Sequence, residues 1–515
     1  MADKRMDPAG IVISVAVTMV AVVVIMPLAQ IALSALAVTP DRWVDLLDDR
    51  IPHLLRNTLS LVVAVTFLSL FWGTLLAWLA HRTDVPGAGT WRWLLALPLA
   101  FPPYVGALAY ISIFGPRGML VEQFAFSPPD IYSFGGAVLI LTAFTYPYVF
   151  LIVGSALRRG GAELEEAAMM TGARPLKILF GITLPLLRPA LLAGGLLVSL
   201  YVLGDFGVVS LLRYPTFTSA IYFQLEGFDP GSAAVLSLVL VMLTMSVLGI
   251  KRLAGPRNGR YSSRRSRPDT RRHYLGGLRI PAMVTVLLSA VATTGIVLSV
   301  LIHWTIRGLA SGVDPRLGTY LANSLMLGVI AASLTMLFSI PVAHQSIRAT
   351  SLSSRITAGL CYAGYSIPGV IIGLGTLATF IGVVSPLYGT AVPMIAALFI
   401  RFLPQNLEAS GASLERVSPD LEEAGRVGGA TRGQVLRKIT IPLMKPGVLA
   451  GGALVFVSSI KELPASLILR PAGFDTLAVR VWMEAAEGFY ELAAPAALLI
   501  VGISLVFLRL SVEDF

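Results

Sequence analysis

The sequence predicts an all-α polytopic membrane protein with about twelve transmembrane helices, built as two parallel repeats of six. Three observations support this prediction: the chain is apolar, its apolar runs have the length of a membrane span, and its halves repeat one pattern. Of the 515 residues, 56% are hydrophobic and 13% are charged, whereas a soluble domain has about 25% charged residues. The mean hydropathy is +0.78. These values exclude an ordinary soluble protein.

Twelve apolar runs are long enough to cross a bilayer. A hydrocarbon core of about 30 Å needs about 20 residues of helix, because backbone polar groups in lipid must be paired within the segment. The runs lie near residues 11–36, 58–80, 92–114, 135–157, 186–212, 231–250, 281–304, 324–346, 357–383, 387–406, 444–469 and 492–510. The first run exceeds the about 7–15 apolar residues of a signal peptide, which favours an uncleaved first helix.

The basic residues are distributed as expected for a multi-pass protein with a cytosolic N-terminus. The twelve spans place 29 of the 39 Lys and Arg residues on the cytosolic side and nine outside, with Lys461 inside a span. This is the positive-inside asymmetry, and it explains the net charge of +10 without a nucleic-acid partner. Because the number of spans is even, both termini are predicted to be cytosolic.

The chain is predicted to contain a first repeat at 1–250, a basic cytosolic linker at 251–280 and a second repeat at 281–515. Asn57 matches Asn323 and Pro102 matches Pro368 at an offset of 266 residues. Further along, Pro147 and Pro404, Gly172 and Gly429, and Pro185 and Pro442 match at an offset of 257. Six spans per repeat make the copies parallel rather than inverted. The seam between them is the expected pathway. The linker could also contact anionic lipid.

One polar patch occurs twice, as EEAAMMTGARPLKILFGITLP from residue 165 and EEAGRVGGATRGQVLRKITIP from residue 422. In the first copy Gly172 is expected to end one short helix and Pro185 to interrupt the next before the membrane. The pattern therefore predicts a helical elbow beneath the bilayer. An amphipathic helix lying on the membrane is the alternative. Repetition at one offset favours docking on a duplicated partner.

The doubled patch resembles the coupling motif of permeases of ATP-binding-cassette importers. It falls on Glu166, Ala167, Ala168, Gly172, Ile182, Leu184 and Pro185, and again on Glu423, Ala424, Gly425, Gly429, Ile439, Ile441 and Pro442. The second copy departs from the motif at Gly425 and Ile441.

The resemblance implies a type I importer-like permease in a bacterial inner membrane. Two copies of a cytosolic ATPase would dock on the elbows, and an extracytoplasmic binding protein would deliver the substrate. ATP and Mg would bind the ATPase, because this chain has no G-x-x-x-x-G-K-[ST] phosphate loop. The chain itself is expected to bind no cofactor and to be no enzyme.

Charged residues inside predicted spans indicate a pathway, because a charge at mid-bilayer costs about 2.5–3.5 kcal/mol and tends to face the interior. Asp205 and Glu462 occupy equivalent positions 257 residues apart. Lys461 lies beside Glu462. The remaining candidates for the pathway are Tyr201, Pro102 and Pro368. Alternatively, the carboxylates cap helix ends, or Lys461 and Glu462 pair with each other.

The segments LGDFGVVSLLRYPTFTSAIY and KELPASLILRPAGFDTLAVRVW resemble the fused permeases of ferric-iron importers. Thiamine, polyamine and phosphonate permeases are the alternatives within the same machinery. An ion-gradient-driven secondary transporter is the alternative from another class. A tight metal site is not expected, since the five histidines show no paired ligand spacing and Cys361 is the only cysteine.

Overall fold

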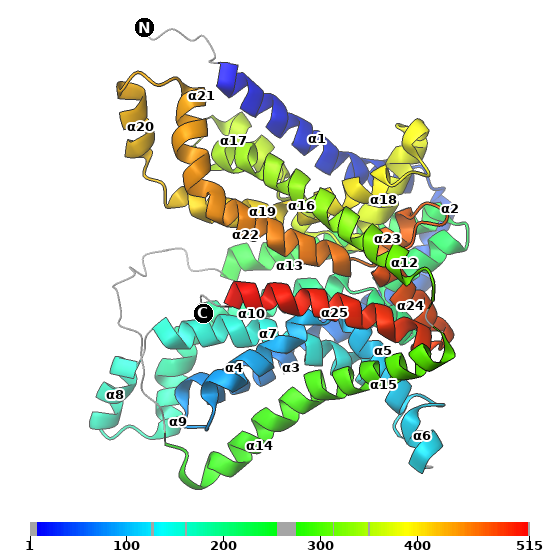
Figure 1. Cartoon of the computed structure of the whole chain (residues 1–515), viewed down its shortest axis with the longest axis vertical. Coiled ribbons are helices and arrows are strands. Elements are labelled where there is room, and N and C mark those ends of the chain that lie inside the picture. The colour runs from blue at the N-terminus through cyan, green and yellow to red at the C-terminus, as the bar shows by residue number, and fades with distance from the viewer. Residues whose placement is uncertain are drawn as a thin grey trace.

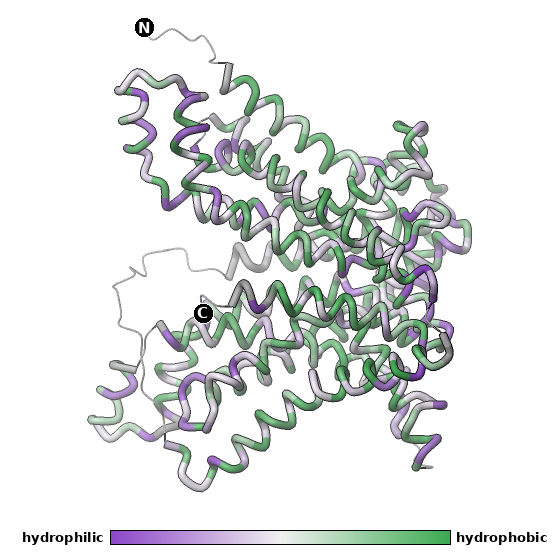
Figure 2. The backbone as a smooth tube through the Cα atoms, in the orientation of Figure 1, coloured by the Kyte–Doolittle hydropathy of each residue, from purple (hydrophilic) through white to green (hydrophobic). Residues whose placement is uncertain are grey.

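The computed structural model describes residues 8–124, 128–159, 162–254, 274–312, 314–348 and 351–512. Every regular element over these residues is a helix. Ten helices within the described ranges are long and apolar enough to cross a membrane. Apolar residues run along most of their length, and polar residues gather near their ends (Figure 2). The all-helical polytopic fold is therefore confirmed.

Ten candidate spans are found among the described residues, against the twelve or so that the sequence predicts. They are Gly10–Leu36, Pro40–Arg82, Pro103–Phe124, Phe134–Arg158, Leu179–Gly204, Pro230–Gly249, Gly276–Ala310, Leu317–Arg348, Arg432–Lys461 and Tyr490–Phe507. Two of the predicted runs, at 357–383 and 387–406, do not form a helix that is both long and apolar enough to be a candidate span. The physical reason differs between the two runs.

Proline interrupts the run at 357–383. Helix α17 (Leu352–Leu360) is followed by a 3-10 turn and by Pro368, whose φ of −53° and ψ of 141° lie outside the helical region. Proline has no N–H to donate and disfavours helix in the residue before it. Helix α18 (Gly369–Gly382) therefore starts afresh and has only 14 residues.

The run at 387–406 forms helix α19 (Val392–Glu415), which has 24 residues. Its length is sufficient for a span. It is too polar for a typical span because it carries Arg401, Gln405, Asn406 and Glu408 within about two turns. Of these side chains, Asn406 is fully buried, so the polar residues of α19 are partly directed into the protein.

The order of helices in the first half repeats in the second. Helices α3 (Ile51–Arg82) and α16 (Leu317–Arg348) both have 32 residues, and α10 (Leu184–Gly204) and α22 (Ile441–Lys461) both have 21. The other long pairs are α7 (Phe134–Arg159) with α19, α12 (Phe217–Glu226) with α24 (Leu477–Glu487), and α13 (Pro230–Ala254) with α25 (Tyr490–Val512). Residues 255–273 of the predicted linker lie outside the described residues.

The first helix of each half packs against the other half. Helix α1 (Pro8–Leu36) lies along α16, α17 and α18, whereas α14 (Arg279–Ala290) and α15 (Ile296–Ser311) lie beside α4 (Ala88–Ala96) and α5 (Pro103–Phe114) (Figure 1). Two contacts illustrate the exchange: Tyr110 on α5 donates a hydrogen bond of 3.0 Å to the Ala292 carbonyl, and the Cys361 sulfur is 3.9 Å from the Val17 carbonyl. The halves are therefore interlocked.

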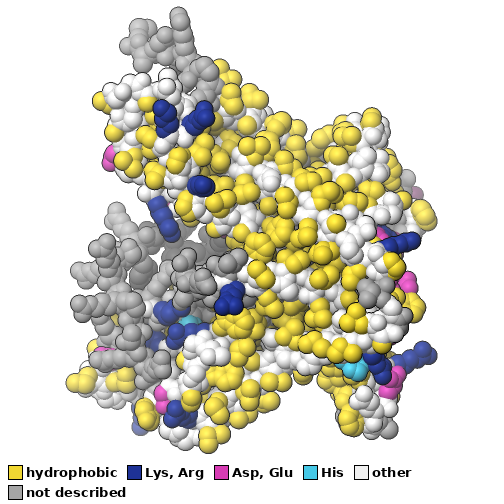
Figure 3. Space-filling model, in the orientation of Figure 1, with side chains coloured by type: hydrophobic (Ala, Val, Ile, Leu, Met, Phe, Trp, Pro, Cys, Tyr) yellow, Lys and Arg dark blue, Asp and Glu magenta, His cyan; other side chains and the backbone are white. Residues whose placement is uncertain are grey.

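The two halves diverge at one end of the molecule and pack together at the other. Helices α8 and α20 lie at the tips of two separate lobes on the left of Figure 1, and α12, α18 and α24 lie together on the right. We call the left end the elbow end. Hydrophobic side chains cover the middle of the face in Figure 3, and most charged side chains lie towards its two ends.

The contact between α1 and α18 generates a stability prediction. A Cβ at Gly375 would lie 2.5 Å from the Pro27 carbonyl oxygen, which is too close for two non-bonded heavy atoms. We expect Gly375→Ala to lower the free energy of unfolding by about 1–3 kcal/mol through overpacking, measured by thermal unfolding in detergent. Gly382→Ala on the same helix is the control, because its Cβ would meet only Gln30 at 3.7 Å. Equal stability of the two variants would contradict this packing.

Candidate functional site

Each doubled sequence patch folds into two short helices joined by a turn, at the tip of one lobe. The first elbow comprises α8 (Ala162–Met170), α9 (Pro175–Ile178) and a π turn at Leu179–Thr183 that leads into α10. The second elbow comprises α20 (Pro419–Val427), α21 (Arg432–Val435) and a π turn at Leu436–Thr440 that leads into α22. The two elbows match element by element (Figure 1).

Glycine is required at the bend of each elbow. Gly172 has a φ of +79° and Gly429 a φ of +86°, values that L-residues with a side chain rarely adopt. In each copy the amide of the third residue past the helix donates a 3.0 Å hydrogen bond to a carbonyl five residues earlier, Ala173 to Ala168 and Ala430 to Gly425. This is the Schellman arrangement that pairs the last carbonyls of a helix. No atom lies within 4 Å of a Cβ built at either glycine, so both bends are open.

The other residues of the predicted coupling motif lie mainly on the elbow surfaces. Ala167, Ala424, Pro185 and Pro442 are exposed, and Ala168 and Glu166 are half-buried. Glu423 is 67% exposed and lies 3.7 Å from Arg426 on the next turn of its own helix. The two copies therefore present a similar surface of small and acidic residues around an open glycine.

One hydrogen bond between side chains, which the sequence analysis did not predict, closes each elbow. The Thr183 hydroxyl donates 2.7 Å to Glu165, and the Thr440 hydroxyl donates 3.1 Å to Glu422. The glutamates are 257 residues apart, as are the threonines. We call this contact the Glu–Thr bridge. The repeat of both residue types at one offset was the signal that could have revealed it.

The Glu–Thr bridge joins the elbow to the membrane helices. Each threonine is the last residue of a π turn, and a proline follows two residues later at Pro185 or Pro442. A proline removes one hydrogen bond of the helix and crowds the carbonyl four residues back, which accounts for the widened turn. Glu422 also lies 3.5 Å from Arg348 at the end of α16. The second elbow is thereby tied to two long helices.

The candidate pathway residues gather where α10 and α22 stop. Helix α10 ends at Gly204 and the short α11 (Gly207–Leu211) follows, whereas α22 ends at Lys461 and α23 (Pro464–Leu469) follows. Asp205 accepts hydrogen bonds from the Val208 and Val209 amides at 3.1 and 3.2 Å. Glu462 accepts one from the Ala465 amide at 3.3 Å. Both carboxylates thus pair the free amides at the start of a short helix.

The two carboxylates differ in their charge partners. Glu462 forms a 2.8 Å ion pair with Arg401 of α19. The position equivalent to Arg401 in the first half is Phe144, and Asp205 makes no ion pair among the described residues. Lys461 does not pair with Glu462. Its ammonium donates 3.0 Å to the Leu99 carbonyl of the opposite half, so the simple Lys461–Glu462 pairing is wrong.

The two predicted prolines lie at the contact between the halves, and their side chains are buried. Pro102 and Pro368 are buried and precede α5 and α18. A Cβ at Gly204 would lie 3.7 Å from Pro368 of the other half, and the Tyr104 hydroxyl is 3.5 Å from the Lys461 carbonyl. The end of each long helix thus meets the proline break of the opposite half. We call this region the seam.

Half-buried side chains line the seam at equivalent positions. In the first half the rings of Tyr148 and Tyr201 lie 5.7 Å apart. The residues at these positions in the second half are Gln405 and Ser458, and the Ser458 hydroxyl donates 3.1 Å to Gln405. All four are half-buried. The first half thus contributes an aromatic surface where the second contributes a polar one.

Beyond the helix breaks, away from the elbow end, aromatic side chains join the halves. Phe206 and Tyr222 of the first half pack against each other and against Trp482 of the second, with ring centroids 4.9–5.8 Å apart. The Trp482 indole also donates 2.9 Å to Ser210. This cluster was not predicted, because its members come from segments far apart in the sequence.

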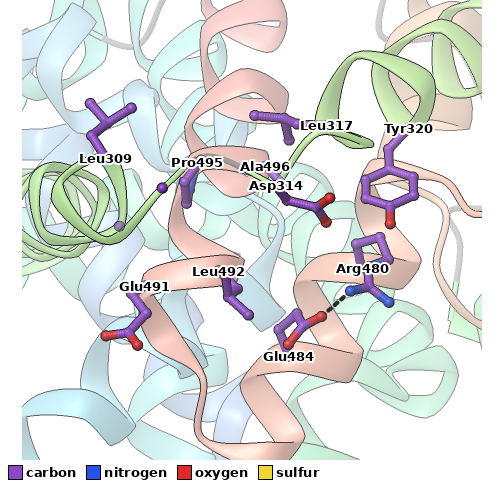
Figure 4. Close-up of a pocket in the computed structure, with 12 residues that line it drawn as sticks. Leu309, Asp314, Leu317, Tyr320, Arg480, Glu484, Glu491, Leu492, Pro495 and Ala496 are labelled. Carbon is purple, nitrogen blue, oxygen red and sulfur yellow. Dashed lines mark hydrogen bonds and ion pairs between the residues drawn. The ribbon is translucent and has the colours of Figure 1, made fainter.

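A pocket lies apart from these contacts, between α15, α16, α24 and α25 (Figure 4). Arg480 and Glu484 on its wall pair with each other, and the Arg480 guanidinium lies 5.2 Å from the centre of the Tyr320 ring. Among the described residues, no three His, Cys, Asp or Glu side chains gather as metal ligands. The Arg480 and Glu484 side chains of the pocket thus already have partners within the second half.

Comparison with known proteins gives a consistent family. Residues 325–512 match the model of the binding-protein-dependent transport system inner membrane component. The Fe(3+)-transport system permease protein FbpB 2 of Haemophilus influenzae is 30% identical over 92% of this chain and 93% of its own length. The ferric transport system permease protein FbpB of Actinobacillus pleuropneumoniae is 25% identical over 86% of this chain. The molybdenum permease ModB of Escherichia coli is 32% identical, with 92% of its length matching 38% of this chain.

The Glu–Thr bridges generate a prediction about the elbows. Thr183→Val and Thr440→Val keep the side-chain shape but remove the donor to a glutamate, which weakens a hydrogen bond to a charged group worth about 1.5–3 kcal/mol. We expect backbone amides of the elbow concerned to exchange with deuterium about tenfold or more faster. Thr171→Val is the control, since that hydroxyl bonds only to Ala168 in its own turn. Unchanged exchange in both test variants would show that the bridges do not hold the elbows.

Proposed function

Because this chain belongs to the binding-protein-dependent transport permeases, and is the non-catalytic membrane component of an ATP-binding-cassette importer, we propose that its cargo is ferric iron. The observation that carries this proposal is the 30% identity to a permease named for Fe(3+) transport over nearly the whole of both chains. Two further relatives named for ferric transport match 84% and 86% of this chain. The molybdenum relative corresponds to a single half.

The remaining cargo classes have less support. Thiamine, polyamine and phosphonate stay as alternatives within the same machinery, since their carriers would need the same elbows and seam. A secondary transporter driven by an ion gradient is not supported, because the family depends on a binding protein. Family membership implies an ATPase and a binding protein as partners. ATP and Mg would act on the ATPase chain.

We propose twelve membrane crossings in two parallel repeats of six, 1–250 and 281–515, which the linker at 251–280 connects. The interrupted α17–α18 segment and α19 would add two crossings to the ten candidate spans. Of the polar side chains of α19, Asn406 is buried and Glu408 is exposed. The matched element order supports this arrangement. Helix α1 begins and α25 ends at the elbow end (Figure 1), so both termini would lie in the cytosol with the elbows.

The elbows are the proposed docking sites for two copies of the ATPase. Small residues around an open glycine allow close approach of a partner backbone, and exposed Glu423 and its counterpart Glu166 offer acidic contacts. The Glu–Thr bridge would carry movement of a docked ATPase directly into α10 and α22. The binding protein would dock at the opposite end, where α12 and α24 lie.

Reconstituted uptake tests the cargo. Proteoliposomes would hold this chain, its ATPase and its binding protein, with ATP and Mg on the ATPase side. We expect ferric iron to accumulate only with ATP. Thiamine, a polyamine and a phosphonate, offered separately, should not accumulate. ATP-dependent uptake of one of these instead would replace iron as the cargo, and uptake driven by an ion gradient alone would refute the importer mechanism.

Substitution of the bend glycines tests docking. We expect Gly172→Leu with Gly429→Leu to lower ATP-driven uptake by about tenfold or more, equivalent to about 1.4 kcal/mol, while the chain still folds in the membrane. Gly389→Leu is the control, because Gly389 has a φ of +80° and open space but lies outside both elbows.

Asparagine separates the two roles of these glycines, since it tolerates the left-handed conformation better than other L-residues. If a partner backbone approaches closely, Gly429→Asn should impair uptake at least as strongly as Gly429→Ala. If only the conformation matters, asparagine should be tolerated and alanine should not. Wild-type uptake by the double leucine variant would remove the docking proposal.

A further inference from the structure

The charges that reach the surface of the seam are cationic. Asp205 and Glu462 are only 8% and 5% exposed, and both direct their oxygens to backbone amides at the start of a short helix. The Arg401 side chain is 23% exposed, and Lys461 is half-buried. The carboxylates that the sequence offered as contacts for a cation are therefore held within the walls.

Among the described residues of the seam, Lys461 is the cation that lacks a counter-ion, and Asp205 is the carboxylate that lacks one. The positive charge of Arg401 is balanced by Glu462 at 2.8 Å. Lys461 makes no ion pair in the part of the chain that the structure describes, and its ammonium donates to one carbonyl, that of Leu99. A Lys ammonium has three donors. Two of them are thus available at the contact between the halves.

The neighbouring seam residues add neutral donors to this charge. Tyr148 and Tyr201 of the first half and Gln405 of the second carry O–H or N–H groups and are half-buried. The Ser458 hydroxyl already donates to Gln405. Tyr201 also lies within electrostatic reach of Asp205, Arg401 and Glu462. The nearby carboxylates of Asp205 and Glu462 are buried and accept hydrogen bonds from backbone amides. The surface thus suits anionic oxygens better than a bare metal cation.

We propose that the seam passes its cargo as an anionic species, in which a ferric ion keeps oxygen-donor anions such as a carboxylate chelator or phosphate, and that Lys461 contacts those anionic oxygens. This inference rests on the proposed function and specifies the chemical form of its cargo. A bare Fe3+ would be repelled by the uncompensated ammonium, whereas its anionic ligands are attracted to it.

The asymmetry of the duplication supports one contact rather than two. The position of Lys461 is occupied in the first half by Gly204, so a single ammonium serves the whole seam. One half-buried charge assisted by neutral donors binds an anion weakly. A transport path requires this, because a site that binds tightly cannot release.

Substitutions at Lys461 test the contact in the reconstituted importer. We expect Lys461→Gln and Lys461→Glu to slow iron uptake by about tenfold or more, the effect of losing a charge-assisted hydrogen bond. Lys461→Arg should retain most of the rate. Lys445→Gln, an exposed lysine on the same helix, should not change it. Stimulation of ATP hydrolysis by the binding protein should persist in all variants, which separates loss of the cargo contact from loss of folding or coupling.

Double labelling tests the cargo form directly. Vesicles would receive labelled ferric iron with labelled citrate, or with labelled phosphate, so that each anion source is scored separately. We expect at least one anion to accumulate together with iron. Accumulation of iron without either anion, or faster uptake by Lys461→Glu, would overturn the proposal.

The same vesicles distinguish this proposal from the assignment of iron. If wild-type vesicles take up no iron, ferric iron is not the cargo. The charge of the compound that they do take up then tests whether the seam passes an anionic species. Uptake of a phosphonate or of molybdate, slowed by Lys461→Gln, would uphold an anionic cargo. Uptake of thiamine or of a polyamine, both cations, would overturn it.

Discussion

The constraint on which this structure depends is that the backbone cannot be left unpaired inside a membrane. Long helices meet it automatically, and every interruption has to supply its own hydrogen-bond partners. At the two breaks where α10 and α22 end, Asp205 and Glu462 accept hydrogen bonds from amides of the short helices that follow. At the elbows, the Schellman turns around Gly172 and Gly429 pair the last carbonyls. Each site of interest is therefore a place where a helix stops and a specific residue compensates.

The duplication conserves architecture more strictly than chemistry. Glu165 with Thr183 is repeated by Glu422 with Thr440, and this pair closes each elbow. In the seam, by contrast, Phe144 stands where the second half has Arg401, and Gly204 stands where it has Lys461. Parts that would meet two identical ATPase subunits are alike. Parts that would meet one asymmetric cargo have diverged, as a single pathway allows.

Interlocking of the halves gives the molecule a route for mechanical coupling. Helix α1 packs on the second half and α14–α15 on the first, so neither half can move as an independent bundle. At the far end, Trp482 packs against both Phe206 and Tyr222 and donates a hydrogen bond to Ser210. The elbow ends are separate (Figure 1). A movement that brings the elbows together would act on this aromatic contact through α10 and α22, which run from the Glu–Thr bridges to the breaks.

Much of this protein was determined by sequence alone, because hydropathy, charge bias and repeat offsets are local or periodic signals. They predicted the all-helical membrane fold, the doubled elbow with its glycine bend, and the family. They did not reveal that proline interrupts the run at 357–383 or that α19 is too polar to count as a span, since a run of apolar residues does not show where the helix stops. Nor did they reveal that Glu462 pairs with Arg401, 61 residues away in the chain, rather than with its neighbour Lys461. Which charges are neutralised and which face the seam depends on contacts between distant helices, and only the tertiary structure decides those.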